Sequence, residues 1–385
     1  MHSLFAGNPR PKVGFLTGGQ LGLMCLQELI AYPVETYAFD KDPQASCAAF
    51  VHHFTQGDPL DADQVYEFGK DLDLIIVEFE HVSTEGLKKL KDKGVRVVVD
   101  PEILEVIQNK GEQKKLWEEL GLNTAEFRFF ECGENLANYP ELFPAAIKTC
   151  KGGYDGGGVE ILKDCPADYP ILEPVIVEQL IDFEMELSII VCRDFYGNIS
   201  FYPLVEQVFC PKQNLVELLA APAEILSGKP ELQKEAEEIA RKVVEAFDYH
   251  GVMAVELFLN KSGELLINEV APRVHNSGHH TIEANITSQF AQHVRIALGL
   301  KLGSTEMVKP AAMANLLGAE GFNGPAVYEG IADAVKDNQT FVHTYNKLKT
   351  KPHRKMGHLT VLADSVAEAK ARALELRPLI KIVSK

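Results

Sequence analysis

The chain has 385 residues, of which 46% are hydrophobic and 24% are charged, a composition typical of a folded protein with two or three domains. Its formal net charge of −17 disfavours nucleic acid and anionic membranes as partners, because both would repel it. No run of 18 apolar residues predicts a membrane span, and seven scattered cysteines without a C-x-x-C pair indicate free thiols in a reducing cytoplasm.

The first hundred residues alternate between strand-like and helix-like segments. A helix is predicted over residues 23–32. Strands are predicted at residues 12–17, 35–40, 71–80 and 95–100. This alternation is typical of βαβ units, so we expect a first domain with a parallel sheet over residues 1–110.

The sequence TGGQLG, at residues 17–22, lies between the first strand and the first helix, and Asp40 follows 18 residues after its last glycine. The motif is close to a dinucleotide-binding fingerprint, but its spacing is G-G-x-x-G instead of G-x-G-x-x-G. Tight packing of the turn, or a phosphate-bearing substrate at the helix N-terminus, explains the glycines as well. NAD or flavin binding therefore stays one of three alternatives here.

Beyond residue 110 the pattern changes to α+β. Segment 131–144 is predicted to be a loop, and 282–299 to be largely helical. The other helices are predicted at 112–122, 232–247 and 366–376. The strands are predicted at 144–149, 159–162, 175–181, 185–194, 251–259, 264–270, 311–318 and 358–364.

A second glycine-rich segment, KGGYDGGG at residues 151–158, follows the strand that contains Lys148. Another strand follows it, so it is neither a Walker loop nor a Rossmann turn. The backbone N–H groups of such a hairpin can bind the oxygens of a triphosphate, and Lys148 can add a positive charge. The alternative is an exposed, flexible hairpin.

The two strands at 251–259 and 264–270 are separated by N-K-S-G, which predicts a hairpin. A turn centred near residue 262 places Glu256 opposite position 268 or 269, and hence beside Glu269. Like charges about 5 Å apart are destabilising unless a divalent cation lies between them. Oxygen ligands favour magnesium or manganese, and Asn268 adds a further oxygen. In the alternative register, one glutamate faces solvent.

The segment NEVAPRVHNSGHHTIEA, at residues 268–284, gathers Arg273, His275 and Asn276 just after the predicted metal site. An arginine, an imidazole and an amide there suit a small oxyanion awaiting phosphorylation. The three histidines also raise the alternative of zinc. Pro272 and Gly278 disfavour it, because they do not support a helical H-x-x-x-H face.

Taken together, these segments resemble the ATP-grasp family of 5-(carboxyamino)imidazole ribonucleotide synthases of purine biosynthesis. VEFEHV at 77–82 and HTYNKLKTKPHRKMGH at 343–358 add to the resemblance, which covers nearly the whole chain in the family's order. It implies a fold of the α/β and α+β classes. The implied parts are a Rossmann-like pre-ATP-grasp domain at 1–110, a linker helix and small ATP lid at 111–190, an ATP-grasp core at 191–305, and a C-terminal β-rich tail with a final helix at 306–385.

The resemblance implies a reaction in which ATP, bicarbonate and 5-aminoimidazole ribonucleotide give the N-carboxylated product, ADP and phosphate. Carboxyphosphate would be the intermediate, magnesium or manganese the metal, and a cytoplasmic homodimer the assembly. Three alternatives stay open: a related ATP-grasp ligase using another acid or amine, an NAD-dependent oxidoreductase, and a catalytically silent nucleotide sensor.

The resemblance also implies roles for individual residues. The ATP contacts would be Lys110, Lys148, Gly153, Tyr154, Asp155, Gly156, Gly157, Gly158, Glu178, Gln179, Leu180, Ile181, Glu186, Asn268 and Glu269. The metal ligands would be Glu256 and Glu269. The bicarbonate pocket would hold Glu78, Tyr154, Arg273, His275 and Asn276. The ribonucleotide contacts would be Gln20, Asp155, Lys347, Arg354 and Lys355.

Residues 343–355 contain five lysines and arginines and no acidic residue, which supports a phosphate contact, although a solvated basic face is the alternative. Two positions depart from the family pattern. Gly157 stands where many relatives have lysine or arginine, so a cation is missing there. Asn346 replaces a glycine, and asparagine tolerates positive φ almost as well.

Overall fold

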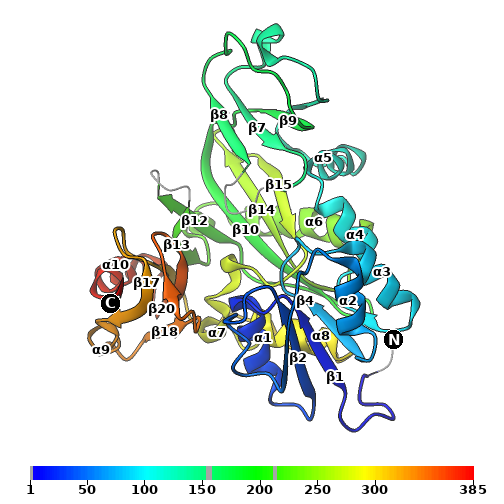
Figure 1. Cartoon of the computed structure of the whole chain (residues 1–385). Helices are drawn as coiled ribbons and strands as arrows, with labels where there is room; N and C mark the ends of the chain where they lie inside the picture. Colours follow the sequence, from blue (N-terminus) through cyan, green and yellow to red (C-terminus); the bar gives the residue numbers. More distant parts are fainter. Residues whose placement is uncertain (1–2, 153–157, 211–214) are drawn as a thin grey trace.

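The computed structural model describes residues 3–152, 158–210 and 215–385. Figure 1 shows a blue N-terminal sheet at the bottom, a small green-cyan sheet at the top and orange C-terminal strands at the left, joined by a long central sheet. Among the described residues, no helix combines the length and apolar character that a membrane crossing requires.

The N-terminal domain has a five-stranded parallel sheet in the order β3-β2-β1-β4-β5, which confirms the predicted βαβ pattern. Its strands are β1 (Lys12–Leu16), β2 (Glu35–Asp40), β3 (His53–Gln56), β4 (Leu74–Val77) and β5 (Arg96–Val97). Its helices are α1 (Gln20–Leu29), α2 (Ala62–Gly69), α3 (Thr84–Asp92) and α4 (Pro101–Ile107). The sequence did not predict β3, because this edge strand is largely exposed and has no apolar alternation.

The first glycine motif packs around a carboxylate of the same domain. Glu78, directly after β4, accepts hydrogen bonds from the backbone N–H groups of Leu21 and Gly22 at 2.9 and 3.2 Å. A Cβ on Gly19 would lie 2.6 Å from a Glu78 oxygen. Asp40 accepts from the Gly18 N–H at 2.7 Å. The helix N-terminus, where a dinucleotide pyrophosphate would bind, is thus already bonded to Glu78.

A linker helix, α5 (Lys110–Glu119), leads to a four-stranded sheet that we call the lid, in the order β6-β9-β7-β8. Its strands are β6 (Phe127–Phe130), β7 (Ala145–Thr149), β8 (Val159–Leu162) and β9 (Val175–Gln179). The predicted loop 131–144 contains two 3-10 turns, η1 (Leu136–Asn138) and η2 (Pro140–Leu142). The lid has its own small apolar core, separate from the core of the central sheet.

The central sheet is antiparallel, in the order β15-β14-β10-β12-β13-β16-β20-β18, and β11 pairs with β10. Its strands are β10 (Phe183–Arg193), β11 (Ile199–Phe201), β12 (Val205–Cys210), β13 (Leu215–Ala221), β14 (Gly251–Asn260), β15 (Leu265–Ala271), β16 (Ala311–Leu317), β18 (Thr340–Thr344) and β20 (Lys355–Leu362). The predicted amphipathic helix, α6 (Glu231–Ala246), packs its apolar side against β10 and β15. On the opposite face, Val252 and Ala254 of β14 belong to a second apolar core with α8, whereas Glu256 and Glu269 line a cavity.

The C-terminal segment continues the central sheet, because β13 pairs with β16. A small sheet, β19-β17-β21, lies beside it.

The predicted domain boundary at residue 305 stays a prediction, as do the predicted boundaries at residues 110 and 190. The further elements are η3 (Glu224–Ser227), η4 (Asn276–Gly278), β17 (Gly324–Glu329), α9 (Ile331–Ala334), β19 (Lys349–Thr350), α10 (Val366–Leu376), η5 (Arg377–Leu379) and β21 (Lys381–Ser384).

Segment 282–299 is largely helical, as predicted, but it contains a break that was not predicted. A single turn, α7 (Thr281–Ala284), ends at an extended Asn285, and a new helix, α8 (Gln289–Ala297), begins after Ser288. The Ser288 hydroxyl accepts from the Ala291 N–H at 3.0 Å, which is an N-cap bond and favours a fresh helix start. Helix α8 then packs against α1 and β14 and so joins the N-terminal domain to the central sheet.

Gly19→Ala tests the packing of the first glycine motif. Gly19 has φ of −73°, so alanine meets no backbone strain, but its methyl group would displace the Glu78 carboxylate from the α1 amides. We expect the free energy of unfolding, measured by urea titration, to fall by about 1–3 kcal/mol. In the control Gly228→Ala, the methyl group meets only the Ile225 carbonyl, at 3.9 Å. Equal stability of the two variants would contradict the packing role.

Candidate active site

A cavity of about 830 Å³ lies where the lid, the central sheet, the N-terminal domain and the basic segment 343–355 meet. Residues predicted for the site from all four parts line it. They are Gln20, Glu78, Lys110, Lys148, Glu178, Gln179, Leu180, Ile181, Glu186, Glu256, Asn268, Glu269, Arg273, His275, Asn276, Lys347, Arg354 and Lys355.

The glycine-rich loop of the lid is described only at its ends. Gly152 lines the cavity, and Gly158, which precedes β8, does not; both have positive φ, of 76° and 77°. The predicted residues Gly153, Tyr154, Asp155, Gly156 and Gly157 lie outside the described residues, so their roles stay predictions.

The predicted register of the hairpin is confirmed: Glu256 in β14 lies directly opposite Glu269 in β15. The register shifts immediately afterwards, from Glu256 opposite Glu269 to Leu257 opposite Ile267, so Asn268 is an extra residue in a β-bulge. Asn268 and Glu269 are consecutive yet both line the cavity, whereas Ile267 faces the core. The bulge therefore adds an amide oxygen beside the two carboxylates.

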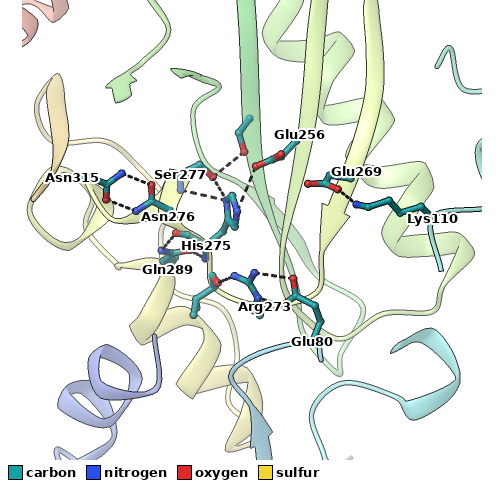
Figure 2. A network of polar contacts seen from close by, with 12 residues as sticks. Glu80, Lys110, Glu256, Glu269, Arg273, His275, Asn276, Ser277, Gln289 and Asn315 are labelled. Carbon is teal, nitrogen blue, oxygen red and sulfur yellow. Dashed lines mark hydrogen bonds and ion pairs between the residues drawn. The ribbon is translucent and has the colours of Figure 1, made fainter. Parts of the chain in front are cut away.

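The two carboxylates have opposite electrostatic surroundings. Burial raises the pKa of Glu256, and repulsion from Glu269 and Glu186 raises it further. Burial also acts on Glu269, but the ammonium of Lys110, 2.6 Å from its Oε2, outweighs burial and lowers the pKa. Glu256 thus tends to keep a proton for as long as no cation neutralises the pair (Figure 2).

The donor atoms fit a hard divalent ion that the protein shares with a nucleotide. Two carboxylates and an amide oxygen are the ligands that magnesium accepts when water and phosphate oxygens complete its shell. The described residues contain no group of three His, Cys, Asp or Glu positioned to hold a metal alone. His279 and His280 are buried, and the His279 ring packs against the rings of Phe290 and His358, which disfavours zinc.

Gln289 fixes the backbone of the loop after β15, a role that was not predicted from the sequence. Its side-chain oxygen accepts from the His275 N–H at 2.9 Å, and its Nε2 donates to the His275 carbonyl at 2.6 Å (Figure 2). A Cβ on Gly278 would lie 2.5 Å from the Gln289 amide. Gly278 is therefore needed for this close approach, which explains a glycine among so many polar residues.

The His275 ring points toward Glu256. The Ser277 N–H donates to Nδ1 at 3.4 Å, so we infer that the ring proton is on Nε2, which lies 3.5 Å from Glu256 Oε1. Burial and the charge of Arg273 lower the pKa of His275 to about 3. The imidazole is thus a neutral N–H donor. The Ser277 hydroxyl, 2.9 Å from Nδ1, also contacts the Ser188 hydroxyl at 2.9 Å.

Arg273 has a partner that the sequence did not reveal. Its Nε and Nη2 donate to the two carboxylate oxygens of Glu80, with Nη2 at 2.9 Å from Oε1, and its Nη1 donates to the Val274 carbonyl at 3.1 Å. Burial opposes ionisation of Glu80, but Arg273 outweighs it and lowers the pKa of this carboxyl. Glu80 is the second glutamate of the VEFEHV segment, which is the one sequence feature that could have indicated this partner. Because Glu80 already bonds the guanidinium, an anion that binds Arg273 would share it with Glu80.

Asn276 is bonded to the central sheet. Its amide and that of Asn315 in β16 exchange two hydrogen bonds of 3.0 Å, and Asn315 also donates to the Val216 carbonyl at 2.8 Å (Figure 2). Asn315 is a positioning residue that the sequence did not predict. Asn276 and Glu78 both line the cavity while bonded to other parts of the protein, so their contacts with bicarbonate stay predictions.

The basic segment closes one end of the cavity. Lys347 donates to the Lys355 carbonyl at 2.7 Å, and Arg354 donates to the Lys349 carbonyl at 2.6 Å. Asn346 has φ of 53°, so its predicted positive φ is confirmed. Its amide donates to the Ser46 carbonyl at 3.3 Å, which connects this segment to the N-terminal domain.

A lid over a central sheet, with a lysine of the lid and a lysine of the linker helix reaching a hairpin that carries paired acidic residues, defines the chain as an ATP-grasp ligase. Three families match it: the ATP-grasp domain over residues 115–290, the ribonucleotide synthetase preATP-grasp domain over 11–108, and the phosphoribosylaminoimidazole carboxylase C-terminal domain over 311–372. The N5-carboxyaminoimidazole ribonucleotide synthase of Bacillus subtilis is 33% identical over 361 residues, 92% of each chain. The chain therefore belongs to the N5-carboxyaminoimidazole ribonucleotide synthase family.

Solved structures are similar over the same length. N5-carboxyaminoimidazole ribonucleotide synthetase from Thermotoga maritima has a TM-score of 0.88 and 35% identity, covering 97% of this chain and 100% of its own. The Aspergillus clavatus synthase in complex with ADP and 5-aminoimidazole ribonucleotide has a TM-score of 0.83 and 29% identity, with 96% and 98% covered. The predicted family and its ATP-grasp fold are confirmed.

Ligand-dependent thermal unfolding tests which glycine motif binds nucleotide. We expect ADP with Mg²⁺, at roughly 100 times its Kd, to stabilise the protein by about 2.7 kcal/mol. NAD⁺ at the same concentration should leave the melting temperature unchanged, because Glu78 already occupies the α1 amides. A shift with NAD⁺ and none with ADP would reverse the assignment of the two motifs.

Proposed function

We propose that this ligase carboxylates 5-aminoimidazole ribonucleotide with bicarbonate and ATP, giving N5-carboxyaminoimidazole ribonucleotide, ADP and phosphate. One observation carries the proposal. Glu256 and Glu269 lie in the middle of a single cavity, which has lysines at one end and Arg273 and His275 at the other. The relative solved with ADP and 5-aminoimidazole ribonucleotide supports both small-molecule substrates.

ATP would bind between the lid and the central sheet. Lys110 and Lys148 reach the carboxylate end of the cavity, where polyphosphate charge would be neutralised. Glu178, Gln179, Leu180 and Ile181 would border the adenine, and Glu186 the ribose. Burial raises the pKa of Glu186 to about 7. Residues 153–158 would cover the phosphates with backbone N–H groups.

Magnesium, or manganese, would be held by Glu256 and Glu269 with Asn268 beside them. The ion would neutralise charge on the phosphates during transfer. Lys110 bonds Glu269 at 2.6 Å, so the protein already places a cation where this charge is needed. Glu256, whose pKa is raised, would release its proton once the pair is neutralised.

Bicarbonate would bind beside Arg273, His275 and Asn276, with Glu78 and Tyr154 completing the pocket. One bicarbonate oxygen forms a bond to the γ-phosphorus of ATP while the bond to the β-phosphate oxygen breaks, which gives carboxyphosphate and ADP. The neutral His275 would donate its Nε2 proton as a hydrogen bond to an anionic oxygen. Glu80 holds the Arg273 guanidinium in place.

The ribonucleotide would bind with its phosphate at Lys347, Arg354 and Lys355 and its base toward the bicarbonate pocket, with Gln20 and Asp155 as further contacts. Its exocyclic amine attacks the carboxyl carbon of carboxyphosphate, or carbon dioxide released from it, and phosphate leaves. Carboxyphosphate is water-labile, so exclusion of water from the site between the lid and the central sheet would protect it. A related ATP-grasp ligase using another acid or amine is the second candidate, because the lining alone does not distinguish amines.

The cellular setting belongs to the same proposal. We place the enzyme in the cytoplasm because its cysteines show no disulfide-type pattern. We propose a homodimer on the strength of the family resemblance.

Phosphate release from ATP tests the reaction and the metal ligands together. The wild-type protein should release phosphate at a rate that requires both 5-aminoimidazole ribonucleotide and bicarbonate. Glu269→Gln should lower kcat by on the order of 10²–10³-fold, because one ionised ligand is lost from the charged transition state. Glu264→Gln, on the exposed turn of the same hairpin, should behave like the wild type.

Two results would contradict this proposal. Phosphate release without bicarbonate, or with a different amine at a higher rate, would favour the second candidate. Normal turnover by Glu269→Gln would show that the metal assignment is wrong.

A further inference from the structure

Helix α5 carries two lysines one turn apart that point into the protein. Lys110 reaches Glu269, as described above. The Lys114 side chain is only 3% exposed, and its ammonium lies 3.3 Å from Glu178 Oε1, in an ion pair without hydrogen-bond geometry. Lysine is almost never fully buried unless it is paired, so a buried Lys114 at the edge of the nucleotide cavity calls for a physical reason.

Lys114 is held firmly. Its ammonium donates to the Thr124 hydroxyl at 2.6 Å, and that hydroxyl donates to the Ile267 carbonyl at 2.7 Å. Ile267 directly precedes the bulge residue Asn268 in β15. The lysine is thus tied to the strand that carries Glu269 as well as to the lid.

Glu178 connects Lys114 to the nucleotide end of the cavity. It lies in β9, its side chain is 4% exposed, and its second oxygen is 2.8 Å from Lys148 Nζ. Lys148 also donates to Asn268 Oδ1 at 3.2 Å. The carboxylate therefore has a lysine on each oxygen. Each Glu178 oxygen forms an ion pair with one of the two lysines, whereas the family resemblance implied a contact between Glu178 and adenine.

The charge of this triad depends on Lys114. Lys148 and Glu178 alone form a neutral pair, which offers little attraction to a polyphosphate. With Lys114 the three side chains carry a net charge of +1. The added charge is buried, so solvent screens it weakly.

We propose that Lys114 is a positioning residue for ATP that acts through Glu178. It neutralises this carboxylate, so that Lys148 stays directed at the nucleotide and the triad keeps a positive charge toward the polyphosphate. The inference rests on the proposed function, in which Lys148 contacts the phosphates of ATP.

The titration of Lys114 provides a signature that a purely structural side chain would not have. Burial and the charge of Lys148 together lower its pKa to about 8, against the opposite effects of Glu178 and Glu269. Among the described residues, these three are the charged groups that shift its pKa. Lys114 is protonated below about pH 8 and loses its charge above it, so nucleotide affinity should fall as the pH rises through this value.

Isothermal titration with ADP and a fixed excess of Mg²⁺, at pH 7 and pH 9, tests the inference. At pH 7, Lys114→Met should bind ADP about tenfold more weakly than the wild type, the effect of one charge near a partly buried phosphate. The wild type should weaken toward the Lys114→Met value at pH 9. Lys114→Arg keeps its charge at both pH values, so its affinity should stay constant.

Adenosine, measured by competition with ADP, separates phosphate binding from damage to the adenine pocket. Its affinity should be equal in the wild type and in Lys114→Met, because adenosine has no phosphate. Equal weakening of adenosine and ADP, or unchanged ADP binding by Lys114→Met, would overturn the inference. A wild-type protein that does not bind ADP at all would instead overturn the proposed function.

Discussion

Repulsion between two carboxylates that face each other in the cavity is the constraint on which this site depends. Glu256 and Glu269 face each other on neighbouring strands, where two full negative charges cannot persist without a cation. Lys110 supplies a positive charge to one of them, and the other has a raised pKa. The protein is therefore prepared for a cation that arrives with a polyphosphate. Lys110 and side chains of the loop after β15 lie around the pair (Figure 2).

The rest of the architecture keeps this hairpin in place and leaves space beside it. Helix α6 covers one face of the central sheet and α8 covers part of the opposite face, where the carboxylate pair of β14 and β15 lines the cavity. Gln289 and Asn315 anchor the loop through His275 and Asn276, which places an arginine and a neutral imidazole next to the carboxylates. In the N-terminal domain, Glu78 binds the amides at the start of α1, so the nucleotide is left to the lid.

The sequence predicted what depends on local spacing. The N-K-S-G turn limited the partner of Glu256 to position 268 or 269, because hairpin pairing follows from the turn, and the bulge at Asn268 then places Glu269 opposite Glu256. Contacts between distant segments had no such signal: Glu80 and Arg273 are 193 residues apart, and Asn276 and Asn315 are 39 apart. The role of the first glycine motif stayed ambiguous, because backbone N–H groups of a glycine turn can bind a ligand phosphate or a carboxylate of the protein, here Glu78. The break before Ser288 was missed because its cap competes with an otherwise helical pattern.

Electron paramagnetic resonance of Mn²⁺ tests the central claim most directly, since it counts bound metal without needing turnover. We expect one Mn²⁺ per chain to bind tightly when ADP is present, with much weaker binding when ADP is absent. The double variant Glu256→Gln/Glu269→Gln should lose this ADP-dependent signal while its melting temperature stays close to that of the wild type. An unchanged Mn²⁺ signal in the double variant would contradict a metal held between these two strands.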